Sequence, residues 1–187
     1  MRALLSLLVS LFAARAHTAE LYRLDAGNTR VSVEVRLFGL PWLSAHFAQL
    51  SGVLMPEPRS SANRLDVNVQ SASLVCDNPR WNARLLSAEW FDAQRFPQIS
   101  YHSTRLLFDQ VGGVLVDGQL TLRGLTRDLA LTVSQWRCSH RSAAGDSCSF
   151  EAHARIKRSE FGLPHGFWQG GDEVDILIHG VRAEASP

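Results

Sequence analysis

Alternating apolar and polar residues predict β-strands along most of this chain, and the clearest case is the segment 114–136. One face of its two arms consists of Gly118, Leu120 and Leu122, and of Leu129, Leu131 and Val133. Between the arms, residues 123–127 (Arg-Gly-Leu-Thr-Arg) supply the glycine and the polar side chains that a reversal needs. The segment is therefore predicted to be a hairpin with a five-residue turn, one solvated face and one apolar face.

The same alternation predicts further strands at residues 22–25, 29–38, 45–55, 64–75, 97–108, 149–156 and 173–181. Residues 77–93 follow another pattern, because Asn78 is placed to cap a helix and Pro79 suits its first position. Trp81, Leu85 and Leu86 form the apolar stripe of that helix. The chain is thus predicted to be all-β, with about eight antiparallel strands in a barrel or sandwich and a short helical insertion near residues 79–93.

The first sixteen residues have the features of a secretory signal peptide. Arg2 precedes an apolar run, and Ala14 and Ala16 are the small residues that a signal peptidase reads. Cleavage is expected after Ala16, with Ala19 as the alternative. A membrane anchor is the competing interpretation, but the run is shorter than the roughly 20 apolar residues of a spanning helix. We expect an exported, periplasmic protein without a transmembrane segment in its mature chain.

Charge and length restrict the partners of the remaining chain. The full sequence has 19 Lys and Arg against 18 Asp and Glu, and residues 1–16 contain two arginines and no acid, so the mature balance is 19 − 2 = 17 against 18. The basic residues are scattered, whereas a nucleic-acid surface needs them clustered among aromatic residues. Residues 20–187 are therefore predicted to form a single domain that does not bind nucleic acid.

Three cysteines would enter an oxidising compartment with this chain. Cys138 and Cys148 flank a polar loop between two predicted strands, which favours a disulfide that stabilises the fold by roughly 2–3 kcal/mol. A metal site formed by these two cysteines and His140 is the alternative, although paired spacing and a clear fourth ligand are missing. Cys76 is left as a buried thiol or as a reactive one.

Three segments carry a family resemblance. They are RWNARLLSAEWFDAQRFPQISY at residues 80–101, GQLTLRGLTR at 118–127, and RSEFGL at 158–163, which precedes GDEVDILI at 171–178. Their order, spacing and residue types resemble the YceI family of secreted, lipocalin-like proteins. In that resemblance, the hairpin glycines of the family correspond to Gly118 and Gly124. The segment at the barrel mouth corresponds to Ser87, Phe91, Phe96 and Pro97. A late turn corresponds to Arg158, Ser159, Phe161 and Gly162.

The resemblance implies a lipocalin-like, antiparallel, eight-stranded β-barrel that encloses a long apolar molecule. A polyisoprenoid, an isoprenoid quinone or a fatty-acyl compound would be held for storage or transport, with no catalytic residues and no cofactor other than such a bound lipid. A membrane redox protein is the implied partner for handover, and the protein would be a monomer or a homodimer. Leu37 and Arg84 stand where the family commonly has histidine, which makes the cavity more apolar at one point and places a cation near its mouth.

The residues predicted to contact the guest are Val31, Val33, Val35, Leu37, Phe47, Arg84, Phe91, Phe96, Leu120, Leu122, Leu131, Val133, Ala152, Ala154, Phe161 and Trp168. Alternation alone shows which face is buried and does not show whether the middle is empty. The aromatic residues of segment 81–96 could form a lid or a permanent plug. An enzyme acting on an apolar substrate and a structural protein with a filled barrel therefore remain the alternatives.

Overall fold

The computed structural model describes residues 22–55, 64–76, 78–108, 114–141, 145–165 and 171–183. The strands are β1 (Tyr22–Leu24), β2 (Arg30–Leu37), β3 (Leu40–Phe47), β4 (Leu50–Met55), β5 (Arg64–Gln70), β6 (Leu74–Cys76), β7 (Gln98–Phe108), β8 (Val114–Leu122), β9 (Leu125–Arg141), β10 (Gly145–Lys157) and β11 (Glu173–Ala183). An α-helix, α1 (Pro79–Leu86), and two 3-10 turns, η1 (Ser71–Ser73) and η2 (Arg158–Phe161), accompany them.

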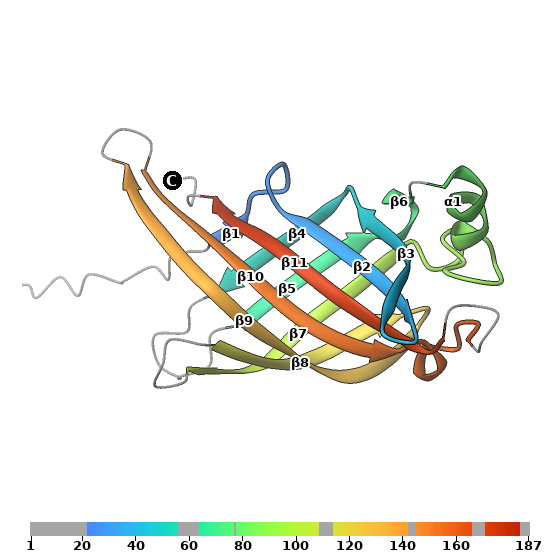
Figure 1. Cartoon of the computed structure of the whole chain (residues 1–187). Coiled ribbons are helices and arrows are strands. Elements are labelled where there is room, and N and C mark those ends of the chain that lie inside the picture. The colour runs from blue at the N-terminus through green and yellow to red at the C-terminus, as the bar shows by residue number, and fades with distance from the viewer. Residues whose placement is uncertain are drawn as a thin grey trace, which may run out of the picture.

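All these strands belong to one curled antiparallel sheet (Figure 1). Neighbours follow the order β1-β4-β5-β7-β8-β9-β10-β11-β2-β3-β6, and β1 also pairs with β11. The hydrogen-bonded ladder therefore returns to β1 after β11, while β2, β3 and β6 extend it at the end where α1 lies. The prediction of an all-β, antiparallel domain is confirmed.

The predicted count of eight strands is wrong, because the described residues form eleven. Two of the expected strands, 45–55 and 64–75, are each divided into two. The segment 45–55 breaks at Gln49, whose amide donates to the Ser73 hydroxyl, and η1 interrupts the segment 64–75.

Two tight hairpins lie near α1, and both have two-residue turns. Leu122 pairs with Leu125, so the predicted five-residue turn between β8 and β9 is wrong. The ladder continues through Thr126, whose hydroxyl lies 2.8 Å from that of Thr121. Arg123 and Gly124 alone make the reversal, with φ angles of 52° and 73° that suit a type I′ turn. Phe38 and Gly39 make the equivalent turn between β2 and β3.

Helix α1 begins as the sequence predicts. The Asn78 side chain accepts a hydrogen bond from the Arg80 amide, and Pro79 stands at the first position. The helix ends at Leu86, earlier than the predicted insertion, and turns follow it. Ser87 ends this helix, with its hydroxyl donating to the carbonyl of Arg84.

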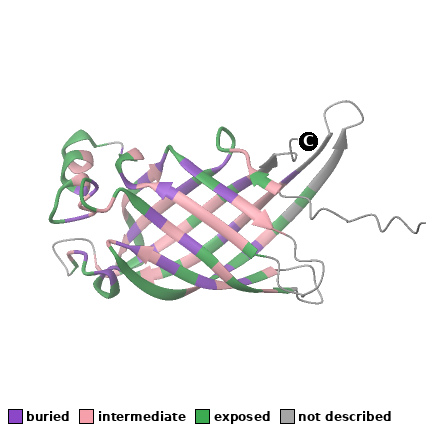
Figure 2. Ribbon diagram, turned by 180° about the vertical axis from the view of Figure 1, so that it is seen from behind, coloured by how far each residue is buried: buried purple, intermediate pink, exposed green. Residues whose placement is uncertain are grey.

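Buried residues follow the inner face of the curled sheet, and the outer face is exposed (Figure 2). Some inward glycines provide space for rings on neighbouring strands. A Cβ on Gly118 would lie 2.5 Å from Tyr101 Cζ, and one on Gly180 would lie 2.2 Å from Phe150 Cζ. The space next to Gly118 is thus already filled by Tyr101, and the cavity lies between such rings.

Asp175 joins three strands on the outer face of the sheet. Its carboxylate lies 2.6 Å from Arg155 Nε of β10 and 2.5 Å from Arg36 Nε of β2. The hydrogen bond from Arg155 is the main reason that the pKa of Asp175 is lowered from its ordinary value of 3.8; burial opposes this shift, and the positive charges of Arg155 and Arg36 add to it.

A lowered folded-state pKa means that this stabilisation is present above pH 3.8 and disappears as the pH falls through the folded-state value. Asp175→Asn should therefore lower the unfolding free energy by about 0.2–1 kcal/mol at neutral pH and by less in acid. Urea unfolding of both proteins from pH 2 to pH 7 measures this. A stability difference that does not shrink as the pH falls would contradict the role assigned to the carboxylate.

Candidate functional site

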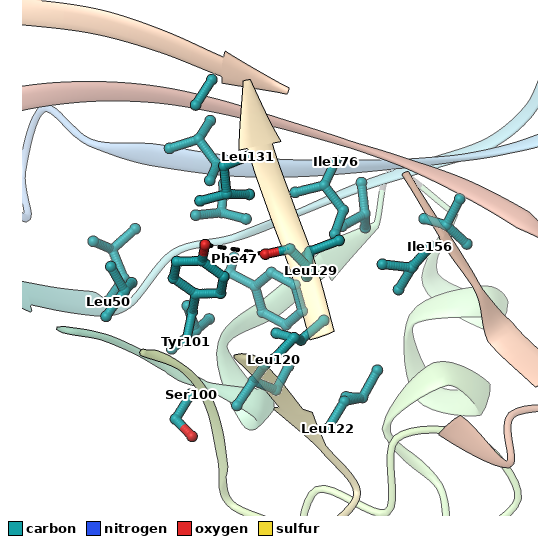
Figure 3. A pocket seen from close by; sticks show the side chains of 18 of the residues that line it. Phe47, Leu50, Ser100, Tyr101, Leu120, Leu122, Leu129, Leu131, Ile156 and Ile176 are labelled. Atoms are coloured by element: carbon teal, nitrogen blue, oxygen red, sulfur yellow. Dashed lines mark hydrogen bonds between the residues drawn. The ribbon is translucent and has the colours of Figure 1, made fainter. Parts of the chain in front are cut away.

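The inner face of the sheet surrounds an elongated cavity of about 160 Å³. A single enclosed water needs roughly 10–15 Å³, so the cavity is large enough for part of an organic molecule. Its wall extends from Val133 and Phe150, at the end remote from α1, to Leu85 and Trp90, in and after α1. Figure 3 shows Phe47, Tyr101, Leu120, Leu129 and Leu131 pointing toward one another across the interior.

The wall of this cavity is almost wholly apolar. Among the 33 described residues that line it, Arg158 is the only one with a charged side chain. The hydroxyl of Tyr101 lies 2.8 Å from the Val116 carbonyl oxygen and 3.2 Å from that of Leu129 (Figure 3). Burial raises the pKa of Tyr101 far above its ordinary value, with a smaller contribution from Asp117, so the phenol stays neutral. A guest in this cavity meets hydrocarbon on nearly every side.

Aromatic residues close the end of the cavity next to α1. Trp90 is 1% exposed and lines the cavity together with Phe91, whose ring contacts Phe47 edge-on at 5.9 Å. Trp81 of α1 makes edge contacts with Trp90 at 5.9 Å and with Trp42 of β3 at 5.0 Å. Trp42 occupies the extra position of a β-bulge opposite Val35 and Arg36, which directs its side chain toward α1. A continuous set of rings thus joins the cavity to the β2–β3 hairpin.

Arg158 brings a buried cation to the same end. It is 2% exposed, its guanidinium lies 5.4 Å from the Trp90 ring centroid, and its Nη2 donates to the carbonyl of Gly171. Burial lowers the pKa of Arg158, and the negative charge of Asp172 partly offsets that effect. Asp172 is itself held by the amide and hydroxyl of Ser159, each at 2.8 Å. The RSEF motif therefore fixes a charged side chain behind Trp90.

The structure brings most of the predicted guest-contacting residues together. Those that line the cavity are Val31, Val33, Val35, Phe47, Phe91, Leu120, Leu122, Leu131, Val133 and Ala152. Those that do not line it are Leu37, Arg84, Phe96, Ala154 and Phe161. Trp168 lies outside the described residues. Contact of these residues with a guest stays a prediction.

The residues outside the lining have other partners. Arg84 is exposed on α1, 3.7 Å from Glu89 and above the Trp81 ring at 5.4 Å. Phe96 packs over Gly124. Phe161 is 1% exposed in η2 and belongs to the packed core.

Sequence reasoning missed more than half of the 33 described lining residues, many of them on β3, β4, β5, β7 and β11. They include Leu43, Ala45, Leu50, Leu65, Val67, Val69, Ile99, Tyr101, Val174, Ile176 and Ile178. Their alternation is as clear as that of Val31 and Val33, and extending the same face around every strand would have found them. Arg158 carries no such signal, because its position depends on the 3-10 turn after β10.

Groups suited to acid–base chemistry lie elsewhere. The described residues that line the cavity include no histidine, aspartate or glutamate. His102 Nδ1 lies 2.7 Å from Asp66, but both side chains are outside the lining, and that of His102 is exposed. Burial alone would raise the pKa of Asp66, but the hydrogen bonds from His102 and Arg64 outweigh it and lower that pKa. The two side chains therefore form a hydrogen-bonded pair outside the cavity.

Two further features bear on the sequence predictions. No group of three or more His, Cys, Asp or Glu side chains suited to a metal ion occurs among the residues described. Within the same residues, no helix is long and apolar enough to cross a membrane. The proposed leader, residues 1–16, lies outside the described part of the chain.

The cysteines are placed as follows. Cys138 and Cys148 are direct partners in the ladder between β9 and β10, and Cys148 is buried. The side chain of Cys138 is not among those described, so the disulfide stays a prediction. Cys76 is a free, buried thiol at the end of β6.

A family model described as the YceI-like domain matches residues 22–181, which is nearly the whole described chain. This chain belongs to that family. Protein YceI of Salmonella arizonae is 26% identical over 172 residues, covering 90% of this chain and 89% of the relative. The resemblance inferred from the three sequence segments is thus confirmed.

Solved structures agree with the YceI-like fold. BcnA of Burkholderia cenocepacia superposes with a TM-score of 0.70 at 24% identity, covering 84% of this chain and 98% of BcnA. A polyisoprenoid binding domain from Saccharophagus degradans, implicated in plant cell wall breakdown, superposes with a TM-score of 0.61 at 16% identity, covering 90% of this chain and all 100% of that domain. At these identities the likeness shows a common fold.

Proposed function

We propose that this YceI-like protein is a carrier that encloses a long apolar chain of the polyisoprenoid class, such as an isoprenoid quinone tail, in its internal cavity. The observation that carries this proposal is the length and composition of the cavity wall, which runs from Phe150 to Trp90 and has one charged side chain among its described residues. The solved polyisoprenoid binding domain with the same fold supports the choice of guest.

Simple transfer energetics favour such a guest. Each CH₂ group moved from water into an apolar cavity gains about 0.8 kcal/mol, so a chain of several prenyl units binds without polar contacts. A polar group placed against the same wall would lose its water and find few partners, because Tyr101 already bonds to backbone carbonyls. The cavity therefore selects for hydrocarbon and binds without catalysing, while its walls offer little to distinguish one head group from another.

The setting of the carrier is part of the proposal. The leader at residues 1–16 supports export to the periplasm, where a quinone carrier would exchange its guest with a membrane redox protein. Mature protein recovered from a periplasmic fraction, with an N-terminus at His17 or Glu20, is the expected result of N-terminal sequencing. Retention of Met1 would contradict export by cleavage.

Mass spectrometry of a solvent extract tests the carrier function. Protein purified without detergent should release a long-chain isoprenoid or quinone in a ratio near one per chain. Protein first stripped of lipid should take up a polyprenol and become resistant to thermal unfolding, since a ligand bound to the native state raises its stability. Protein that yields no lipid and takes up none would refute the proposal.

The disulfide between Cys138 and Cys148 is proposed with the same setting, since the two residues are opposite each other in the ladder. The intact mass of protein purified without reductant should be lower by two hydrogens than that of reduced protein, with Cys76 alone reacting with a thiol reagent after unfolding. Cys138→Ser should cost roughly 2–3 kcal/mol of unfolding free energy. Three reactive thiols in protein taken directly from the periplasm would exclude the bridge.

A further inference from the structure

The tip of the β2–β3 hairpin, Phe38-Gly39-Leu40, exposes two large apolar side chains. Phe38 is 80% exposed and Leu40 is 69% exposed, the two largest exposed fractions among the large apolar residues described. Arg36 Nη1 donates to the Gly39 carbonyl at 3.2 Å and so braces the turn. The tip is therefore an ordered, projecting apolar feature.

The backbone at the tip makes this exposure unusual. Phe38 has a φ angle of 52° at the first position of a type I′ turn, where asparagine, aspartate or glycine is preferred and a bulky residue is strained. Arg123 occupies the same position in the neighbouring hairpin, but its guanidinium donates to the carbonyls of Gly162 and Ala88, at 2.8 and 3.3 Å. Arg123 thus stabilises the fold from its strained position, whereas Phe38 is 80% exposed at the equivalent position.

The tip is also connected to the cavity. It lies at the end of the sheet that carries α1 (Figure 1), and Trp42, two residues beyond Leu40, begins the set of rings that continues through Trp81 to Trp90. Trp90 is part of the cavity wall. A surface that contacts the tip would therefore lie next to the end of the guest site.

We propose that the β2–β3 tip docks on a lipid bilayer and inserts Phe38 and Leu40 among the lipid chains. Two side chains on one tight turn present a few hundred Å² at most, below the roughly 800 Å² per partner of a standard protein interface. The same two side chains suffice for shallow, reversible insertion, in which apolar groups enter the boundary between head groups and acyl chains. The bilayer is also where an apolar guest of the cavity would be dissolved.

Vesicle co-sedimentation tests this docking, with the mature protein and no added guest. Vesicles of phosphatidylcholine alone, and of phosphatidylethanolamine with phosphatidylglycerol, should both bind the wild-type protein. Phe38→Asn should weaken binding by at least about tenfold. The same change should raise Tm by about 2–4 °C, because asparagine suits the turn. Opposite effects on stability and binding separate docking from a merely structural role.

Two further variants complete the test. Leu40→Asn should weaken vesicle binding as well, without the gain in Tm, because Leu40 is not at a strained position. Leu115→Asn is the matched control, since Leu115 is 37% exposed at the start of β8, and it should bind like wild type. Absence of wild-type binding to either vesicle type, or equal binding by Phe38→Asn, would overturn the proposal and leave the tip as a contact for a protein. Docking on a bilayer is a property beyond the carrier function. The vesicle experiment contains no guest, so the docking proposal and the carrier proposal can each fail without the other.

Discussion

Ala152→Phe should abolish uptake of a polyprenol by the lipid-free protein. Ala152 is 1% exposed on β10, lines the cavity, and lies between Val133 of β9 and Ile178 of β11 in the sheet. The side chain of residue 152 points to the inner face of the sheet, so the added phenyl ring must enter the cavity of about 160 Å³. There it occupies space that the guest needs. Affinity should fall by more than tenfold, because several prenyl carbons lose their place in the apolar interior.

Ala130→Phe is the matched control for this loss. Ala130 is exposed on β9, so the same substitution adds its ring to the outer face and should leave uptake unchanged. Titration of each stripped protein with a fluorescent polyprenol measures the affinity, and a thermal melt verifies that both variants fold. Equal affinities of the two variants would show that the guest binds somewhere other than the interior.

Gly118→Ala should be the most destabilising of the small substitutions in the sheet. The added Cβ would lie 2.5 Å from Tyr101 Cζ and 2.6 Å from the carbonyl oxygen of His102. The ring can shift only by giving up its hydrogen bond to Val116, and the carbonyl belongs to the neighbouring strand, so the ladder itself must move. The unfolding free energy should fall by about 1–3 kcal/mol or more, as overpacking of a dense interior usually does.

Gly27→Ala is the control for that prediction. Its nearest neighbour would be the Asp25 carboxylate at 3.4 Å, an ordinary contact in an exposed turn. Urea unfolding should give Gly27→Ala a stability close to wild type and Gly118→Ala a clearly lower midpoint. Equal midpoints for Gly118→Ala and the wild-type protein would mean that Tyr101 is not packed over this glycine.

Local patterns predicted the parts of this fold that depend on local interactions. Val31, Val33 and Val35 alternate on β2 and line the cavity, because strand geometry sends every second side chain to the same face. Asn78 and Pro79 begin α1 because a cap and a first-turn proline act within one turn of helix. The YceI-like motifs then identified the family from segments spread along the chain.

Other parts depend on contacts between distant segments and could not be predicted in this way. The break between β3 and β4 is held by Ser73, whose hydroxyl bonds to Gln49 from 24 residues away. Alternation places Gly118 on the apolar face, but it does not show that Tyr101 of β7 fills the space beside this glycine. Ala154 has the same strand phase as Ala152 and does not line the cavity, since alternation gives the face of a residue and not its depth.

In the candidate site, too, local patterns predicted some residues, and contacts between distant segments determine others. Most of the predicted apolar lining is brought together, whereas Arg84 is outside the lining and lies on α1 beside Glu89. Arg158 was assigned to a turn and proves to be the charged residue of the lining. Its burial results from the ring of Trp90 and the carbonyl of Gly171, both far from it in the sequence.

A crystal structure of the protein loaded with a polyprenol that carries a heavy atom at its tail end is the most direct test of the carrier account. The account predicts continuous ligand density along the interior, between Phe150 at one end and Trp90 at the other, with the marked tail inside the sheet. Density confined to the outer surface, with the interior side chains closed together, would contradict it.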